Sequence, residues 1–238
     1  MIPLKDDNPT KKKSVIRLIL VIICSIVFLI QITSVNNNEL IFYFGFKPNS
    51  IFNSTYQVKT FTPLLTIFTS MFMHGGWLHF LGNMLYLWIF ADNIEDKVGR
   101  KKFILFYLLS GIAAALTQYL GDTQSSIPMI GASGAIAGVL GAYIYFFPRA
   151  KVLVIIPLLI FFFTARLPSI IVLGFWFFIQ FINLTFLSNS SSNVAWLAHI
   201  GGFLFGLIYA FLFKEKTRKK GKSKLIKKRK GDDNPWNN

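Results

Sequence analysis

Apolar residues dominate six stretches of the chain, separated by polar segments. They cover residues 14–32, 78–94, 103–120, 133–147, 168–186 and 194–213. Most approach the roughly 20 residues that a helix needs to cross the hydrocarbon core of a bilayer. The composition agrees, because hydrophobic residues make up 53% of the 238 positions and mean hydropathy is +0.53. The pattern predicts a membrane protein with several spanning helices.

A seventh apolar run, at residues 152–165, is shorter and contains Pro157. As a helix it would rise roughly 21 Å, less than the ~30 Å hydrocarbon core. Charge decides whether it is counted. Lys11, Lys12 and Lys13 precede the first stretch, and residues 214–238 carry eleven Lys and Arg against three acids. Basic flanks face the cytoplasm, so both termini are expected there and the number of spans must be even. We therefore expect six spans, with residues 152–165 along the interface or against the bundle.

The predicted fold class is an all-α polytopic membrane protein, a six-transmembrane-helix bundle with both termini cytoplasmic. Residues 1–13 form a cytoplasmic N-terminal segment, residues 14–213 the membrane domain and residues 214–238 a polybasic cytoplasmic tail. The tail has a net charge of 11 − 3 = +8, which suits a topology anchor that also contacts anionic lipid headgroups. Nucleic-acid binding is not expected, because no aromatic residues interleave the charges. Cys24 is the single cysteine, so no disulfide can form within the chain.

Four polar residues stand at a similar depth in three of the predicted spans. His79 and Asn83 lie near the outer end of the second span, Ser133 at the outer start of the fourth, and His199 about one turn into the sixth. Polar groups are costly inside a membrane, so each is a candidate for function. Individually, each could instead be an N-cap or an interhelical hydrogen bond. Their common depth favours one shared site.

Small residues indicate how that site could be assembled. Gly134 and Gly138 are spaced as a small-xxx-small pair, and Gly202 and Gly206 lie three and seven residues after His199. Such surfaces let helices approach closely. A close crossing of the fourth and sixth spans would carry His199 toward Ser133. A serine beside a histidine is the minimum apparatus for acyl transfer, and further donors suit a developing oxyanion.

Three blocks of sequence resemble the rhomboid intramembrane serine proteases. They are residues 74–83, with His79 and Asn83; Gly131-Ala132-Ser133-Gly134; and Ala198-His199-Ile200-Gly201-Gly202 followed by Gly206. The resemblance runs from about residue 62 to residue 213. Gly-x-Ser-Gly is weak alone, whereas three blocks in the right spans are specific.

The resemblance implies roles for these residues. Ser133 would be the nucleophile, His199 the general base, and His79, Asn83 and the Ser133 N–H the oxyanion hole. Gly131 and Gly134 would shape the serine turn, and Gly202 and Gly206 would keep the sixth span near the fourth. The fifth span and the loop at residues 187–193 resemble the mobile gate for substrate entry. Glu95 and Gly99 fall at structural positions in the loop after the second span.

Two departures from the family pattern stand out. Many members carry an aromatic residue one turn after the nucleophile, which stacks on the catalytic histidine, and here that residue is Ala137. His199 would then be held by another ring, such as that of Phe203. The Trp-Arg pair of some members is absent from the first long loop, where Thr66 stands at the arginine position.

The expected function is cleavage of single-span membrane proteins, without a cofactor. The sequence has no His-Glu-x-x-His, no Cys/His cluster and no phosphate-binding loop, so no metal or nucleotide is expected. A catalytically silent relative that binds membrane clients is the main alternative. A transporter would need inverted repeats or broken helices. The Lys-rich, Cys-poor composition and the short segment before the first span favour a bacterial plasma membrane, with the active site opening to the outer side.

Overall fold

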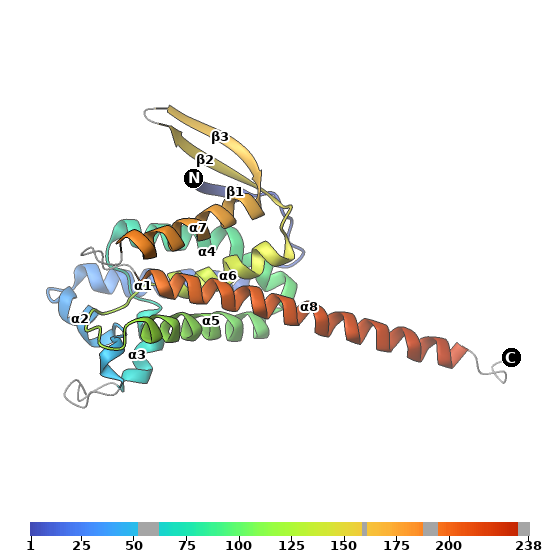
Figure 1. The fold of residues 1–238 in the computed structure, drawn as a ribbon, viewed down its shortest axis with the longest axis horizontal. Helices are drawn as coiled ribbons and strands as arrows, with labels where there is room; N and C mark the ends of the chain where they lie inside the picture. Colours follow the sequence, from blue (N-terminus) through green and yellow to red (C-terminus); the bar gives the residue numbers. More distant parts are fainter. Residues whose placement is uncertain (52–61, 159–160, 188–194, 233–238) are drawn as a thin grey trace.

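The computed structural model describes residues 1–51, 62–158, 161–187 and 195–232, with side chains up to Lys214. Its described part is mostly helical (Figure 1). The helices are α1 (Val15–Thr33), α2 (Asn37–Phe44), the 3-10 turn η1 (Pro48–Ser50), α3 (Pro63–Ser70), α4 (Trp77–Val98), α5 (Arg100–Gly121), α6 (Ser133–Phe146), α7 (Ser169–Leu187) and α8 (Trp196–Asp232). The strands are β1 (Ile2–Asp6), β2 (Lys151–Leu158) and β3 (Phe161–Pro168).

Each of the six predicted stretches falls on a helix, namely α1, α4, α5, α6, α7 and α8. By length and composition, four helices in the described part of the chain could cross a membrane: α1, α5, α7 and the residues 196–214 of α8. α6 is apolar but has only 14 residues, and α4 carries His79 and Asn83 among its apolar positions. Of the six helices on the predicted stretches, α4 and α6 do not meet this criterion. They carry the candidate site residues His79, Asn83 and Ser133.

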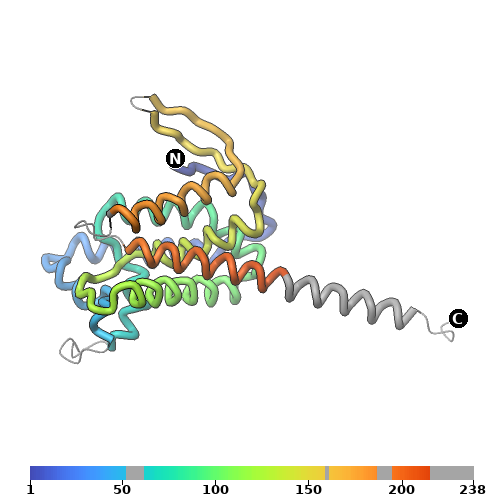
Figure 2. The backbone as a smooth tube through the Cα atoms, in the orientation of Figure 1, coloured from blue at the N-terminus to red at the C-terminus, as the bar shows by residue number. Residues whose placement is uncertain are grey.

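The centre of the molecule is α6. Its residues from Gly134 to Tyr143 are all buried, because α4, α5, α7 and α8 all contact it. α5, α6 and α8 lie side by side (Figure 2). α1 and α7 are more peripheral and expose many large apolar side chains, as helices facing lipid do.

α6 and α8 touch through their backbones. A Cβ added at Gly202 would overlap the carbonyl oxygen of Gly134, and one at Gly206 would overlap that of Gly138. A Cβ at Gly141 would similarly overlap the carbonyl oxygen of Phe203. Glycine at these positions therefore permits a helix–helix distance that no other residue allows.

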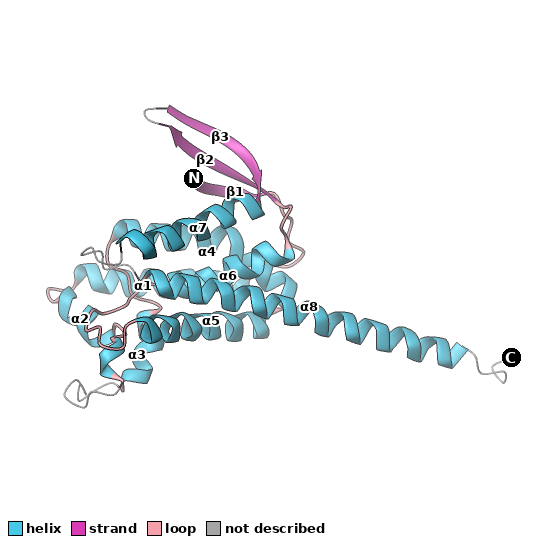
Figure 3. Cartoon of the chain, viewed as in Figure 1, coloured by secondary structure: helices cyan, strands magenta, loops and turns pink. Residues whose placement is uncertain are grey.

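The all-α prediction is wrong in one region, where the chain forms a three-stranded antiparallel sheet in the order β1-β2-β3 (Figure 3). The run at residues 152–165 is a hairpin and not a helix. Val152 and Val154 are fully buried and alternate with more exposed neighbours, which is the period of a half-buried strand. Pro157 is tolerated because β1 pairs only with residues 152–155, so no β1 acceptor faces Pro157.

The N-terminal strand is tied to the helices by Asp6. Its carboxylate accepts hydrogen bonds from the Tyr143 hydroxyl (2.6 Å) and the Asn93 side-chain amide (2.9 Å). Burial raises the pKa of the Asp6 carboxyl, and the Tyr143 hydrogen bond opposes that rise. The segment before the first span therefore packs against α4 and α6.

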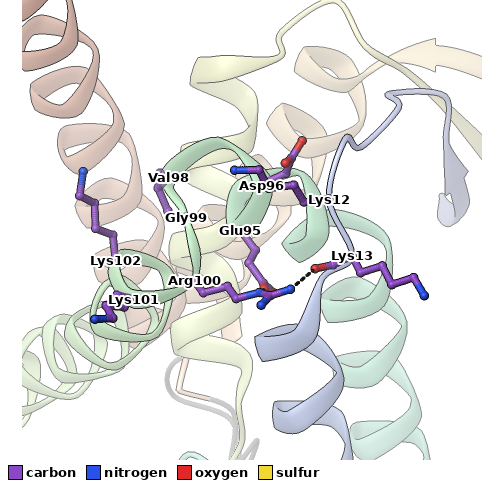
Figure 4. A pocket seen from close by; sticks show the side chains of 9 residues that line it. All are labelled: Lys12, Lys13, Glu95, Asp96, Val98, Gly99, Arg100, Lys101 and Lys102. Atoms are coloured by element: carbon purple, nitrogen blue, oxygen red, sulfur yellow. Dashed lines mark hydrogen bonds and ion pairs between the residues drawn. The ribbon is translucent and has the colours of Figure 1, made fainter.

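Glu95 joins the starts of α1 and α5 to the end of α4 (Figure 4). It lies within α4 and not in the loop where the sequence suggested it. Its carboxylate, 2% exposed, accepts hydrogen bonds from the Ser14 hydroxyl and from the first backbone N–H groups of α1, at Val15, Ile16 and Arg17. Those N–H groups have no acceptor within their own helix. Gly99 follows with φ +85°, a left-handed conformation that lets α5 begin at once.

Candidate active site

Ser133 is the first residue of α6. The turn before it depends on Gly131, which has φ +121° and donates its N–H to the carbonyl of Ser70 (2.9 Å). This conformation is difficult for any residue with a Cβ. Because Ser133 opens the helix, its N–H belongs to the first turn, where backbone donors lack intrahelical acceptors. The serine hydroxyl and a backbone donor thus lie together at the end of the central helix.

His199 reaches Ser133 from α8. The Nε2 atom of its ring lies 2.8 Å from the Ser133 Oγ. The contact follows from the helix crossing, since Gly202 is one turn beyond His199 and lies against the Gly134 backbone. Both side chains are partly buried. The distance is that of a hydrogen bond between a hydroxyl and an imidazole.

His79 and Asn83 approach the same place from α4, four residues apart on one helix face. His79 Nδ1 accepts the Gly75 N–H (3.2 Å), so in the neutral ring the proton is on Nε2. A Cβ added at Gly131 would lie 2.6 Å from His79 Nε2 and 3.5 Å from Ser133 Oγ, so these two atoms flank one small space. The Asn83 side-chain nitrogen is buried without a hydrogen-bond partner among the described residues.

These groups line a cavity of about 750 Å³. Besides the four candidate residues, its wall includes Gly131, Gly134, Trp176, Gln180 and Trp196. Two donors, His79 Nε2–H and Asn83 Nδ2–H, are therefore available near the serine. The arrangement suits acyl transfer, with a nucleophile, an adjacent base and donors that can hold an oxyanion.

The far side of the His199 ring contacts residues that the sequence reasoning missed. Its Nδ1 atom lies 2.8 Å from Oε1 of Gln180, which belongs to α7. The rings nearest it are those of Trp176, with centroids 5.8 Å apart, and Trp196, at 6.0 Å. The prediction that Phe203 holds His199 is therefore wrong. Phe203 stacks on Phe177 (4.5 Å), and the two tryptophan rings lie beside His199 instead. Gln180 is polar within an apolar run, the same signal that singled out His79 and Asn83.

Two further points concern residues beside the site. Ala137 is fully buried and faces Gly202. A Cβ added at Gly202 would lie 3.4 Å from the Ala137 Cβ. The loop expected to form part of the gate, at residues 187–193, lies outside the described residues except for Leu187. Among the residues that the structure describes, no cluster of three or more His, Cys, Asp or Glu could hold a metal ion.

Comparison with known families agrees with this geometry. The sequence model of the Rhomboid domain matches residues 62–216, well over half of the chain. The chain belongs to the rhomboid family. The match includes α4, α6 and the first part of α8, which contribute Ser133, His199, His79 and Asn83. As a family member with several apolar helices, it is a multi-pass integral membrane protein.

Individual relatives come from mitochondria and bacteria. The chain is 29% identical over 178 residues to Rhomboid protein 1, mitochondrial, of Saccharomyces cerevisiae, covering 69% of this chain and 46% of the relative. It is 34% identical over 151 residues to the human Presenilin-associated rhomboid-like protein, mitochondrial, covering 59% and 35%. It is 34% identical over 119 residues to Rhomboid protease GluP of Bacillus subtilis, covering 50% and 22%. The chain thus spans less than half the length of these relatives.

Proposed function

We propose that this rhomboid-family chain is an intramembrane serine endopeptidase that cleaves transmembrane segments with a Ser133–His199 dyad. The observation that carries the proposal is the 2.8 Å contact between Ser133 Oγ and His199 Nε2, in a cavity that the donors His79 and Asn83 also line. A serine hydroxyl alone is a poor nucleophile, and an adjacent base activates it. The similarity to Rhomboid protease GluP supports the same reading.

In the first half of the reaction, His199 Nε2 takes the Ser133 hydroxyl proton as Oγ bonds to the scissile carbonyl carbon. The carbonyl oxygen becomes an oxyanion and accepts hydrogen bonds from His79 Nε2–H, Asn83 Nδ2–H and the Ser133 N–H. His199 then gives its proton to the leaving amine, and the C–N bond breaks. Water, deprotonated by His199, hydrolyses the acyl-enzyme and regenerates Ser133.

The membrane arrangement belongs to the same proposal. The six helices α1, α4, α5, α6, α7 and α8 cross the bilayer, and both termini are cytoplasmic. The short α6 fits because it is surrounded by protein, and the start of the helix then lies below the outer surface. The opposite helix ends carry basic residues, among them Lys97, Lys102 and Lys214, and Lys102 and Lys97 contact the rings of Phe213 and Phe146.

Substrates of this site would be single-span membrane proteins. A peptide bond can reach Ser133 only if its helix unwinds locally, so we expect cleavage near the outer end of a span, where glycine weakens the helix. The basic tail would contact anionic headgroups on the cytoplasmic side. The Bacillus subtilis relatives support a bacterial plasma membrane, and the relatives named mitochondrial make a mitochondrial membrane the alternative.

The second candidate is a silent rhomboid relative that binds membrane clients. It is favoured by Ala137, one turn after Ser133, where many rhomboid proteases carry an aromatic ring. Reconstitution with a model single-span substrate in liposomes separates the two. Wild type should produce two fragments, and Ser133→Ala of equal thermal stability should produce none. Retention of intact substrate by both proteins would overturn the protease proposal and favour client binding.

A further inference from the structure

Gln180 is a polar residue on the peripheral helix α7, and it is 5% exposed. Its side-chain amide makes two contacts. Oε1 lies 2.8 Å from His199 Nδ1, and Nε2 donates to the Trp176 carbonyl oxygen at 3.1 Å. A buried amide in an apolar helix is costly unless both ends are satisfied. Among the described residues each end has one partner, and the two partners favour one orientation of the amide.

The Trp176 contact fixes which end of the amide faces His199. A carbonyl oxygen can only accept a hydrogen bond, so the group pointing at it must be the NH₂ of Gln180. The oxygen of Gln180 must then point at His199 Nδ1. Because that oxygen is also only an acceptor, Nδ1 must carry the proton. The orientation of an amide on α7 therefore determines the tautomer of a ring on α8.

The tautomer decides whether His199 can act as a base. A neutral imidazole carries one proton, so protonated Nδ1 leaves Nε2 with a free lone pair. That lone pair faces the Ser133 hydroxyl at 2.8 Å. In the other tautomer Nε2–H would donate to Oγ and could not remove its proton. We propose that Gln180 is a positioning residue for the dyad, holding His199 in the tautomer that deprotonates Ser133; this rests on the proposed function.

Other contacts around the ring leave this role open for Gln180. The nearest rings, Trp176 and Trp196, are tilted by 42° and 81° to the His199 ring and limit its position. An indole N–H can only donate, so neither ring supplies an acceptor for Nδ1–H. Ala137 offers no ring from α6. An amide also suits this depth better than a carboxylate, because it accepts from Nδ1–H and from the transient imidazolium without burying a permanent negative charge.

Two substitutions separate the acceptor role from packing. Gln180→Met keeps the length and apolar volume but removes the acceptor. Gln180→Glu keeps an oxygen for Nδ1–H and loses the NH₂ that donates to Trp176. The measurement is the rate at which a fluorophosphonate labels Ser133 in detergent. This small probe is chosen because its reaction does not depend on the unwinding of a helical substrate. Phe178→Ala on the exposed face of α7 is the control, since Phe178 is 56% exposed.

Positioning by the acceptor predicts that Gln180→Met labels about 10- to 100-fold more slowly, the scale of one hydrogen bond to a charged group. Gln180→Glu should label within a few-fold of wild type, and Phe178→Ala at the wild-type rate. Equal losses in the Met and Glu variants would show that the amide only fastens α7 and would overturn the inference. So would an unchanged rate in Gln180→Met.

A spectroscopic readout keeps the inference testable if either variant fails to fold. The ¹⁵N spectrum of ring-labelled histidine in wild type, with His199 assigned by comparison with His199→Ala, should show protonated Nδ1 and unprotonated Nε2. Protonated Nε2 would refute the assignment. This outcome is separate from that of the proposed function. Absence of Ser133 labelling in wild type would count against the protease, and the tautomer would still report on Gln180.

Discussion

The two helices beside His199, α6 and α7, differ in how the rest of the protein holds them. α6 is surrounded, with every residue from Gly134 to Tyr143 buried, and it meets α8 through Gly134, Gly138 and Gly141. α7 is peripheral, and Phe175, Phe178 and Phe181 are 45–56% exposed. α6 meets α8 backbone to backbone, whereas α7 meets α8 through the rings of Phe177 and Phe203.

The difference assigns separate tasks to the two helices. α6 fixes Ser133 relative to His199, because two backbones in contact leave little room for sliding. α7 completes the surroundings of His199 with Trp176 and Gln180 through side chains that can separate at smaller cost. Substitutions in α6 or its glycine contacts should therefore damage the fold, whereas those on α7 should damage activity first.

The largest expected effect comes from the same substitution made in both environments. Gly206→Ala places a Cβ against the Gly138 backbone, whereas a Cβ at Gly174 of α7 meets nothing within 4 Å. We expect Gly206→Ala to lower the free energy of unfolding by about 1–3 kcal/mol or to prevent folding. Gly174→Ala should be neutral or stabilising by up to about 1 kcal/mol, because alanine favours helix. Thermal unfolding in one detergent provides the comparison, and equal shifts would refute the account of the α6–α8 contact.

We expect Gly131→Ala to lower the free energy of unfolding less than Gly206→Ala does, and to slow the labelling of Ser133 strongly. The new Cβ would lie 2.6 Å from His79 Nε2, and the residue would have to keep φ +121°. Strain of about 1–3 kcal/mol and displacement of His79 should slow Ser133 labelling, by roughly 100-fold if one oxyanion donor is lost. Gly99→Ala is the matched control, since Gly99 also has a positive φ (+85°) and its added Cβ meets nothing within 4 Å. Unchanged labelling in Gly131→Ala would remove His79 from the oxyanion hole.

A further prediction concerns the attachment of α7 itself. Phe177→Leu removes the ring that stacks on Phe203 at 4.5 Å, which should cost about 0.5–1.5 kcal/mol. Because Trp176 and Gln180 share this attachment, labelling should fall several-fold while the unfolding temperature shifts only slightly. The smallest effect is expected for Phe178→Leu, on the exposed face of the same helix. If the two leucine variants behave alike, the ring stack does not hold α7 in place.

Hydropathy predicted the helical bundle because each span buries its own backbone hydrogen bonds and so depends on local composition. The spacing of Gly202 and Gly206 also predicted the approach of His199 to Ser133, since small residues at helical intervals define a contact face. The sheet was missed because β1 and β2 are about 150 residues apart and the run around Pro157 reads as apolar without a period. Gln180 was missed because its role depends on Trp176 and His199, which only the packing of α7 on α8 brings together.

The central claim is that His199 activates Ser133 as a nucleophile. The most direct test is fluorophosphonate labelling of wild type, Ser133→Ala and His199→Ala, each purified in mild detergent and shown to be folded. The account predicts that wild type is labelled at Ser133 and that neither variant is. A folded wild type that resists labelling, or a His199→Ala variant labelled as fast as wild type, would contradict it.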